Sequence, residues 1–366
     1  MPKLRSAIVL AIVLAAARPA EAHSPPKGEA VPLEDARVLF GEVTELIRKE
    51  YVDPAHAKDD VLYSDAVRGL LKALGPQDEL LTPQELAWMK GSVKGSLVGI
   101  GVVYEKVEGL AVVREVLPGG PAAKTRIRPG DRILQIDGAD TEGLDTMGIG
   151  DRIRGVAGTT VELMMQRGTE EWSERLVRST LEVPSVLGHL REDGVGYLQI
   201  LSFDHHVAEG IDRLLGELGK ARAYVLDLRG CPGGLFKMSI ELASRFLPAG
   251  TRVVTTRDRS GAETVYDTTR KDAVSKPLVV LVNEKTASSA EIVAAALREN
   301  DRALIVGEKS FGKGTVEKIF ELSGGYGLKL TVARFYSPKG HNWQGDGIAP
   351  DFEIPSDVDV RPIYTR

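Results

Sequence analysis

Residues 276–299 have the sequence KPLVVLVNEKTASSAEIVAAALRE, and this stretch decides the fold of the chain. The apolar run through Val282 predicts a buried strand, and Ser289–Glu299 predicts a helix that begins after a short polar turn. Ser288 therefore stands at a helix N-terminus, where free N–H groups and the positive end of the helix dipole favour negative charge. A strand that leads directly into a helix indicates an α/β fold with a sheet that is at least partly parallel.

The same alternation extends on both sides of this stretch. Each helix between two strands implies a crossover connection, so the carboxyl ends of the strands share one edge of the sheet. The expected strands are 195–200, 223–228, 276–282 and 303–306, and the expected helices are 211–218, 237–246 and 289–299.

A lysine in a glycine-rich loop follows the next strand, in the segment SFGKGT at residues 310–315. A serine hydroxyl is a weak nucleophile until a base takes its proton, and a lysine can be that base only when it is neutral. Ser288 and Lys313 together predict a serine hydrolase that needs no histidine.

A second turn between a strand and a helix, DLRGCPGGL at residues 227–235, completes the expected site. Its paired glycines, Gly233 and Gly234, allow backbone N–H groups to point into a cleft. The N–H groups of Ser289 and of one of these glycines are the expected donors to an oxyanion. Asp227 and Arg229 are expected to hold the turn through hydrogen bonds.

Other reactive side chains are weaker candidates. Ser289 competes with Ser288 for the role of nucleophile, but helix geometry rotates it about 100° away. Cys231 is expected to be a small buried thiol. Histidines in loops are more often solvated than catalytic, and those considered are His205 and His206 (a Ser-His-Asp site would use Asp204 or Asp227) and His341.

The N-terminal end has the pattern of an export signal. Lys3 and Arg5 precede an apolar run, and Ala20-Glu21-Ala22 is a cleavage site, so residues 1–22 predict a signal peptide and a periplasmic or otherwise extracytoplasmic protein. Association with a membrane is expected only if this signal stays uncleaved. Residues 23–32 predict a flexible leader, and helices are expected at 33–49, at 64–74 with Ser64 as N-cap, and after Thr82.

The charge and the middle of the chain narrow the function further. The formal net charge is −5, so the chain has no electrostatic reason to bind nucleic acid. No cluster of Cys and His has the spacing of a zinc site. Short β-branched runs separated by glycines between residues 95 and 167 predict a compact β-rich module.

The motifs, taken in order, resemble those of the carboxyl-terminal processing proteases, which are tail-specific serine peptidases with an inserted PDZ domain. The separation of Ser288 and Lys313, 25 residues (313 − 288), is similar to that of this family. The matching segments are YVDP at 51–54, DLR at 227–229, PGG at 232–234, TASSAEI at 286–292, GEKSFGKGTV at 307–316, YSPKG at 336–340 and GDGIAPD at 345–351.

The resemblance implies a multidomain α/β protein with a Clp-protease/crotonase-like catalytic core, a β-rich PDZ domain and an N-terminal helical region. It places the helical region at 33–91, the PDZ domain at 92–169 and the serine peptidase core at 170–366. The implied activity is endoproteolysis near the C-termini of proteins, without a metal or organic cofactor. Substrates would be proteins or peptides with free C-termini, and an adaptor or regulatory protein and a homo-oligomer remain open.

The resemblance also assigns roles to individual residues. Ser288 would be the nucleophile, Lys313 the general base, and Ser289 and Gly234, with Gly233 as a fallback, the oxyanion donors. The PDZ loop that receives an apolar C-terminal tail would be Leu97, Val98, Gly99, Ile100 and Gly101. A PDZ module that serves only for packing or interaction is the alternative.

Three positions depart from the family pattern. Glu317 stands where a glutamine usually orients the lysine, and a carboxylate there favours a charged amine, whereas a general base must be neutral. Cys231 replaces a common asparagine, and Gly75–Asp78 is altered in a way that leaves the role of this segment open. Two other classes therefore remain: a PDZ-based scaffold whose catalytic core has lapsed, and an acyl-thioester enzyme on a related core.

Overall fold

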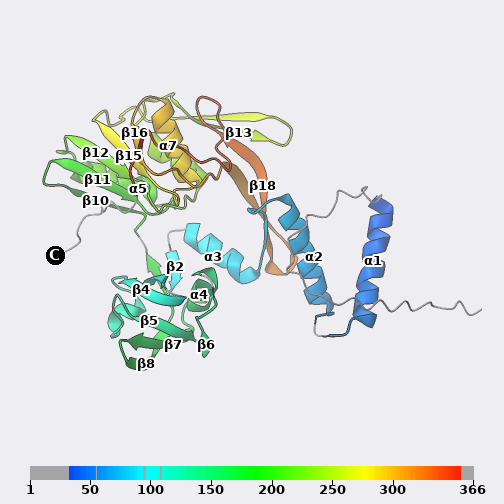
Figure 1. Ribbon diagram of the computed structural model, residues 1–366. Coiled ribbons are helices and arrows are strands. Elements are labelled where there is room, and N and C mark those ends of the chain that lie inside the picture. The colour runs from blue at the N-terminus through cyan, green and yellow to red at the C-terminus, as the bar shows by residue number, and fades with distance from the viewer. Residues whose placement is uncertain are drawn as a thin grey trace, which may run out of the picture. The chain divides into compact units, whose positions relative to one another are not determined.

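The computed structural model describes residues 33–54, 56–93, 96–107, 109–144, 146–182 and 184–355 (Figure 1). The expected signal peptide and leader, residues 1–32, lie outside the described residues. The chain divides into two compact units, Met1–Val67 and Arg68–Arg366. Among the described residues, no helix combines the length and the apolar composition needed to cross a membrane.

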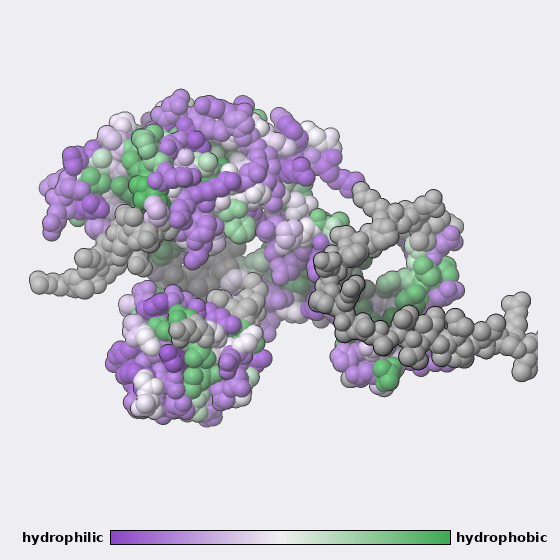
Figure 2. Space-filling model, in the orientation of Figure 1, coloured by the Kyte–Doolittle hydropathy of each residue, from purple (hydrophilic) through white to green (hydrophobic). Residues whose placement is uncertain are grey.

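The first unit contains helix α1 (Leu33–Glu50) and the beginning of helix α2 (Asp59–Leu74). α1 confirms the expected helix, and it leaves large apolar side chains at the surface, such as Val38 with 62% and Leu46 with 59% exposed (Figure 2). The prediction of Ser64 as an N-cap is wrong, because α2 begins at Asp59 and the Ser64 hydroxyl donates to the Val61 carbonyl inside the helix. The acidic first turn of α2 suits the helix dipole and marks its true start.

The helix expected after Thr82 is confirmed as α3 (Pro83–Val93). The Glu85 Oε2 accepts from the Thr82 N–H at 2.6 Å, and the Thr82 hydroxyl accepts from the Glu85 N–H at 3.3 Å. This reciprocal pair is a capping box, which satisfies two backbone donors that the first turn would otherwise leave free.

The β-rich module is an antiparallel sheet in the order β3-β4-β5-β7-β8, with β6 paired to β5. Its core is formed by fully buried apolar residues such as Ile133 and Val161. The expected run through residues 97–103 is broken, because β2 ends at Gly99 and pairs with β9 instead of joining this sheet. The elements are β2 (Ser96–Gly99), β3 (Val102–Val107), β4 (Leu110–Val116), β5 (Arg132–Ile136), β6 (Ala139–Asp140), α4 (Thr146–Ile153), β7 (Thr160–Arg167), β8 (Glu170–Val177) and β9 (Ser179–Glu182).

The catalytic core expected from the sequence contains a six-stranded sheet in the order β10-β11-β12-β15-β16-β19. All neighbouring strands are parallel except β10 and β11, which confirms the predicted mainly parallel sheet. The elements are β10 (Val186–Leu190), β11 (Val195–Ile200), α5 (Val207–Glu217), β12 (Ala223–Asp227), α6 (Phe236–Ala243), β15 (Leu278–Val282), α7 (Ser289–Glu299), β16 (Leu304–Gly307) and β19 (Phe352–Glu353).

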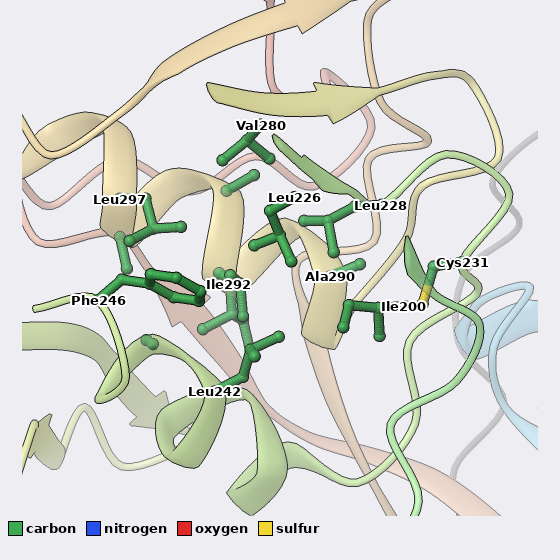
Figure 3. Close-up of a cluster of buried hydrophobic side chains, with 14 of the residues drawn as sticks. Ile200, Leu226, Leu228, Cys231, Leu242, Phe246, Val280, Ala290, Ile292 and Leu297 are labelled. Carbon is green, nitrogen blue, oxygen red and sulfur yellow. The ribbon is translucent and has the colours of Figure 1, made fainter. Parts of the chain in front are cut away.

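Apolar side chains from the strands and from α6 and α7 form the core of this region (Figure 3). Leu226 and Val280 on the strands meet Ile292 and Leu297 on α7, and all four are fully buried. Burial of one such side chain contributes roughly 1.5–3 kcal/mol, so this packing fixes the position of α7 on the sheet. The position of Ser288 follows, because it directly precedes α7.

A second sheet follows the order β1-β18-β13-β14, and β17 pairs with the other edge of β18. Its strands were not predicted, because their pairing depends on segments far apart in the chain. For example, β1 pairs with β18 about 250 residues later. The strands are β1 (Glu79–Leu81), β13 (Arg252–Asp258), β14 (Glu263–Asp267), β17 (Thr315–Glu321) and β18 (Gly327–Tyr336).

Candidate active site

Three neighbouring parallel strands end at the same edge of the six-stranded sheet. β12 ends at Asp227, β15 at Val282 and β16 at Gly307, and these strands are adjacent in the order β12-β15-β16. The glycine turn, the serine turn and the lysine loop follow these three ends in turn. This is the edge at which open α/β sheets place their ligands.

The serine turn holds Ser288 in an uncommon backbone conformation. Ser288 has φ 56° and ψ −117°, a left-handed value that a residue with a Cβ rarely adopts. Its N–H donates to the Glu291 Oε2 at 2.8 Å, and its side chain is half-buried. Backbone strain of this kind persists only where the surroundings enforce it, and it occurs mainly at functional sites.

The glycine turn packs directly against the serine turn. A Cβ on Gly233 would lie 2.7 Å from the Ala287 carbonyl oxygen and 2.9 Å from both the Ser288 Cβ and the Ser289 nitrogen. The Ala287 N–H also donates to the Cys231 carbonyl at 3.0 Å. The expected approach of the two turns is therefore present, and it requires glycine at position 233.

Two backbone donors at this contact have no hydrogen-bond partner among the described residues, namely the N–H groups of Ser289 and Gly234. The N–H of Gly233 is engaged, because it donates to the sulfur of Cys231. The Ser289 hydroxyl donates to the Gly234 carbonyl at 3.0 Å, and Ser289 is only 1% exposed. Ser289 is therefore poorly placed as a competing nucleophile.

One buried carboxylate joins the serine turn to the lysine loop. Glu291 is fully buried, and in addition to the Ser288 N–H it accepts from the Ser310 hydroxyl at 2.6 Å, the Gly312 N–H at 2.7 Å and the Lys313 N–H at 2.8 Å. Burial raises the pKa of Glu291, and these four donors oppose that effect. Glu291 thus fixes the backbones of Ser288 and Lys313 to one point.

The sequence interpretation assigned no role to Glu291. The pattern Ser288-Ser289-Ala290-Glu291 has the form of a capping box, and this could have predicted the bond to the Ser288 N–H. The donors from the lysine loop lie 19–22 residues later in the chain, and no local pattern reveals them.

The side chain of Lys313 is paired with Glu317. The Lys313 Nζ lies 2.8 Å from the Glu317 Oε2, and the two side chains are 21% and 13% exposed. The Thr315 hydroxyl donates to the other oxygen of Glu317 at 2.7 Å. Among the described residues, Lys313 Nζ and Ser288 Oγ make no hydrogen bond to each other, so the amine is held by the carboxylate instead.

The chain segment at 342–348 holds the lysine loop from its other side. The Trp343 Nε1 donates to the Lys313 carbonyl at 3.1 Å, and the Gln344 Oε1 accepts from the Gly314 N–H at 2.7 Å. A Cβ on Gly312 would lie 2.9 Å from the Gly347 nitrogen. The loop is therefore fixed by both the serine turn and this segment.

Several expectations about neighbouring residues are confirmed. Arg229 forms an ion pair with Asp227 at 2.6 Å, and Asp227 also accepts from the Tyr197 hydroxyl, so both help to hold the glycine turn. Burial raises the pKa of the Cys231 thiol to about 12, so the thiol stays protonated at neutral pH. The three histidines considered, His205, His206 and His341, are exposed.

The altered segment Gly75–Asp78 has a structural role in this chain. The Asp78 Oδ1 accepts from the Thr331 N–H of β18 at 2.5 Å. Asp78 directly precedes β1, which pairs with the same strand. The segment therefore anchors β1 to the second sheet.

In the β-rich module, the expected peptide-binding residues span a strand and a turn. Leu97, Val98 and Gly99 lie in β2, and Ile100 and Gly101 form the turn into β3. The N–H groups of Ile100 and Gly101 have no partner among the described residues. Their carbonyls accept from Ala122 and Leu117, both at 2.8 Å, so the turn is fixed while its donors stay free.

The described residues hold no group of three or more His, Cys, Asp or Glu side chains arranged to bind a metal ion. A serine on a helix N-terminus, a lysine loop fixed beside it and free backbone donors between them define a serine-type peptidase.

Comparison with known proteins identifies the family. Residues 194–354 match the model of peptidase family S41, and residues 88–166 match that of the PDZ domain. The chain is 37% identical to the carboxyl-terminal-processing protease of Picosynechococcus sp. over 85% of this chain and 77% of the relative. It is 33% identical to the carboxy-terminal processing protease CtpA of Bacillus subtilis over 85% and 68% of the two chains.

A solved structure gives the same result. The photosystem II D1 C-terminal processing protease is similar with a TM-score of 0.56 and 28% identity, over 90% of this chain and 95% of that one. The chain therefore belongs to the carboxyl-terminal-processing protease family within peptidase family S41. The family, the fold class and the serine-type peptidase activity expected from the sequence are confirmed.

Proposed function

We propose that this protein is an exported serine endopeptidase that cleaves proteins near their C-termini through a Ser288–Lys313 dyad. The observation that carries the proposal is the shared carboxylate of Glu291, which accepts from the N–H groups of both Ser288 and Lys313. A nucleophile and its base must be held within hydrogen-bond reach during catalysis, and a common buried anchor achieves this.

In the first step, the neutral Lys313 amine takes the proton of the Ser288 hydroxyl while its oxygen attacks the substrate carbonyl. The tetrahedral oxyanion is stabilised by the N–H groups of Ser289 and Gly234, with Gly233 as a fallback. The lysine ammonium then gives its proton to the leaving amine, and an acyl-enzyme remains on Ser288. Water, activated by Lys313, hydrolyses this ester and restores the serine.

Glu317 restrains Lys313 in the resting enzyme. The ion pair at 2.8 Å stabilises the charged amine, which cannot act as a base. Activity is therefore expected to rise towards alkaline pH, where the amine loses its proton.

The PDZ domain recognises an apolar C-terminal tail through Leu97, Val98, Gly99, Ile100 and Gly101. The free N–H groups of Ile100 and Gly101 support this role, because they can donate to a terminal carboxylate. The tail then adds as a strand beside the turn, and a pocket selects its last side chain.

The working place of the enzyme is extracytoplasmic, because residues 1–22 have the pattern of a signal peptide. Its partners are proteins or peptides with free C-termini. The exposed apolar side chains of α1 support contact with an adaptor protein or with a second copy of this chain.

The test compares wild type and Ser288→Ala on an unstructured substrate that ends in small apolar residues, between pH 6 and 10. Substrates with free and amidated C-termini are matched in sequence. Cleavage by wild type alone that depends on the free carboxylate is the expected result. Equal cleavage by both proteins would contradict the role of Ser288, and equal use of both termini would contradict tail recognition.

A second candidate is a PDZ-based scaffold with a lapsed catalytic core, and the Lys313–Glu317 ion pair is the observation in its favour. In that case neither protein would cleave the substrate at any pH, and both would bind the free tail. Glu317→Gln would then also stay inactive.

A further inference from the structure

Three arginines gather on the second sheet, close to the lysine loop. Arg257 on β13 lies directly opposite Arg334 on β18, and Arg259 follows in the turn after β13. Like charges directly opposite each other on neighbouring strands destabilise a sheet. Such a pair at this position suggests a function that requires it.

Two of these arginines are available to a ligand. Arg259 and Arg334 are exposed, and neither makes a hydrogen bond or ion pair with another described residue. Arg257 is held in place, because it pairs with Glu263 at 2.6 Å and lies over the ring of Tyr336. Its Nη1 also donates to the Tyr336 hydroxyl at 3.3 Å, which leaves the hydroxyl proton free to donate elsewhere.

The arginines border a hollow of about 300 Å³, which is also lined by Thr331, Val332 and Tyr336. The hollow lies where β13 leaves β18, before β1 joins the same edge of that strand. The nearby acidic groups are already occupied. Glu263 pairs with Arg257, and Asp258 accepts from Ser260 and Ala262 in its own turn, which lowers its pKa.

The strand register relates this hollow to the proposed site. Arg334 lies opposite Arg257 on one side and opposite Thr315 on the other, so the three residues form one row across the sheet. Neighbours in such a row are roughly 4.5–5.5 Å apart, so Arg257 lies about 10 Å from Thr315. Lys313 precedes Thr315 by two residues, which adds about 6–7 Å along the chain.

We propose that Arg257, Arg259 and Arg334 form a subsite that binds a carboxylate of the peptide substrate. At about 3.3 Å per residue, an extended peptide would place this carboxylate about three to five residues from the bond that is cleaved. Guanidinium groups bind carboxylates with good geometry, and Tyr336 can add a hydrogen bond. This proposal rests on the proposed function, because it names what the same enzyme prefers in its substrates.

The test uses a peptide with an apolar free C-terminus and otherwise neutral residues, in which Glu replaces Gln at one position at a time on both sides of the cleaved bond. At low salt, wild type is expected to cleave the Glu peptide about five- to tenfold faster in kcat/KM at one position about three to five residues away. The preference should decrease in 0.5 M NaCl, because salt screens exposed charges.

Arg334→Glu is the decisive variant. It should remove the preference for Glu and create one for Lys at the same position, and it should leave cleavage of the neutral peptide unchanged. Lys220→Glu is the matched control, because Lys220 is an exposed cation with the same change of charge in the turn after α5. A flat Glu scan, or a preference that survives in Arg334→Glu, would overturn the proposal.

Two further arms make the outcome unambiguous. Amidated peptides without Glu show whether Arg334 instead binds the terminal carboxylate, which would support the subsite with a different source of the same group. Binding of the Glu and Gln peptides to Ser288→Ala, with and without Arg334→Glu, decides the proposal even if wild type cleaves nothing. In that case the proposed function fails, while the subsite stands or falls on the affinity ratio.

Discussion

The two ends of helix α7 carry the same residue type in different surroundings. Glu291, in the first turn, is fully buried and accepts four hydrogen bonds from the serine turn and the lysine loop. Glu299, in the last turn, is 15% exposed and accepts from the Lys339 N–H at 2.7 Å and from the ring of His341, which is 74% exposed. Both glutamates fasten later parts of the chain to one helix.

The difference lies in what each contact holds in position. Glu291 fixes the backbone of the two proposed catalytic residues, and a buried carboxylate without all its donors would be costly. Glu299 fastens a surface segment, where water can replace a lost partner. We therefore expect changes at the beginning of α7 to affect catalysis, and changes at its end to affect stability only.

The largest effect is expected from Gly233→Ala, which pushes the glycine turn away from the beginning of α7. The new Cβ would lie within 3 Å of the serine turn, and φ at this position is 89°. Displacement of the Ser289 and Gly234 donors should lower kcat by about 10²–10³-fold, as measured by steady-state kinetics.

Gly230→Ala is the control for backbone strain alone. Gly230 has φ 73°, but no atom lies within 4 Å of its added Cβ. It should cost about 1–2 kcal/mol of stability and leave kcat nearly unchanged. Similar losses of kcat in the two variants would show that strain in the turn, not contact with Ser288, matters.

Glu291→Gln is expected to have the next largest effect. Each oxygen of Glu291 faces two donors, so an amide NH₂ in either orientation opposes two N–H or O–H groups. Stability should fall by about 2–5 kcal/mol and kcat by about 10–10²-fold, with a smaller change in KM. Urea unfolding and kinetics at saturating substrate measure the two losses.

Ser310→Ala is the matched control, because it removes one donor and leaves three in place. It should cost about 1 kcal/mol and less than tenfold in kcat. If Glu291→Gln lost stability but kept kcat, the carboxylate would have no role in positioning the dyad.

This contrast also explains what the sequence could predict. Ser288, Lys313 and the glycine turn were found because each is part of a local pattern of strand, turn and helix. Strand β11 and helix α7 have the predicted bounds, since their apolar residues recur at the spacing of one regular element. The mainly parallel sheet followed from this alternation.

The rest depends on contacts between distant parts of the chain. The role of Glu291 is set by donors from the lysine loop, and β18 is defined by pairing with β1, β13 and β17. Likewise, the ion pair between Lys313 and Glu317 needs a loop that turns both side chains to the same side. Local patterns cannot show which distant partner a polar group will meet.

Glu317→Gln tests the restraint on Lys313 and should have a moderate effect. Without the carboxylate, the amine loses its proton more easily, so the pH midpoint of kcat should move down by about one unit and the rate at pH 7 should rise several-fold. Glu321→Gln, the same change at an exposed position on β17, should leave the profile unchanged. An unchanged profile in both variants would contradict the proposed restraint.

Glu299→Gln at the far end of α7 should have the smallest effect. Burial acts to raise the pKa of Glu299, but hydrogen bonds from His341, Ser337 and Lys339 outweigh it and lower the pKa. A lowered pKa stabilises the fold above the ordinary value of about 4.3, and this contribution is lost as the pH falls through the lowered pKa. At pH 7 the variant should lose about 0.5–1 kcal/mol, and the difference from wild type should shrink in acid. Urea unfolding at pH 7 and pH 4 measures this, with kcat expected to stay within twofold. A large loss of kcat would mean that the segment around His341 transmits its position to the lysine loop, and the two ends of α7 would then serve the site together.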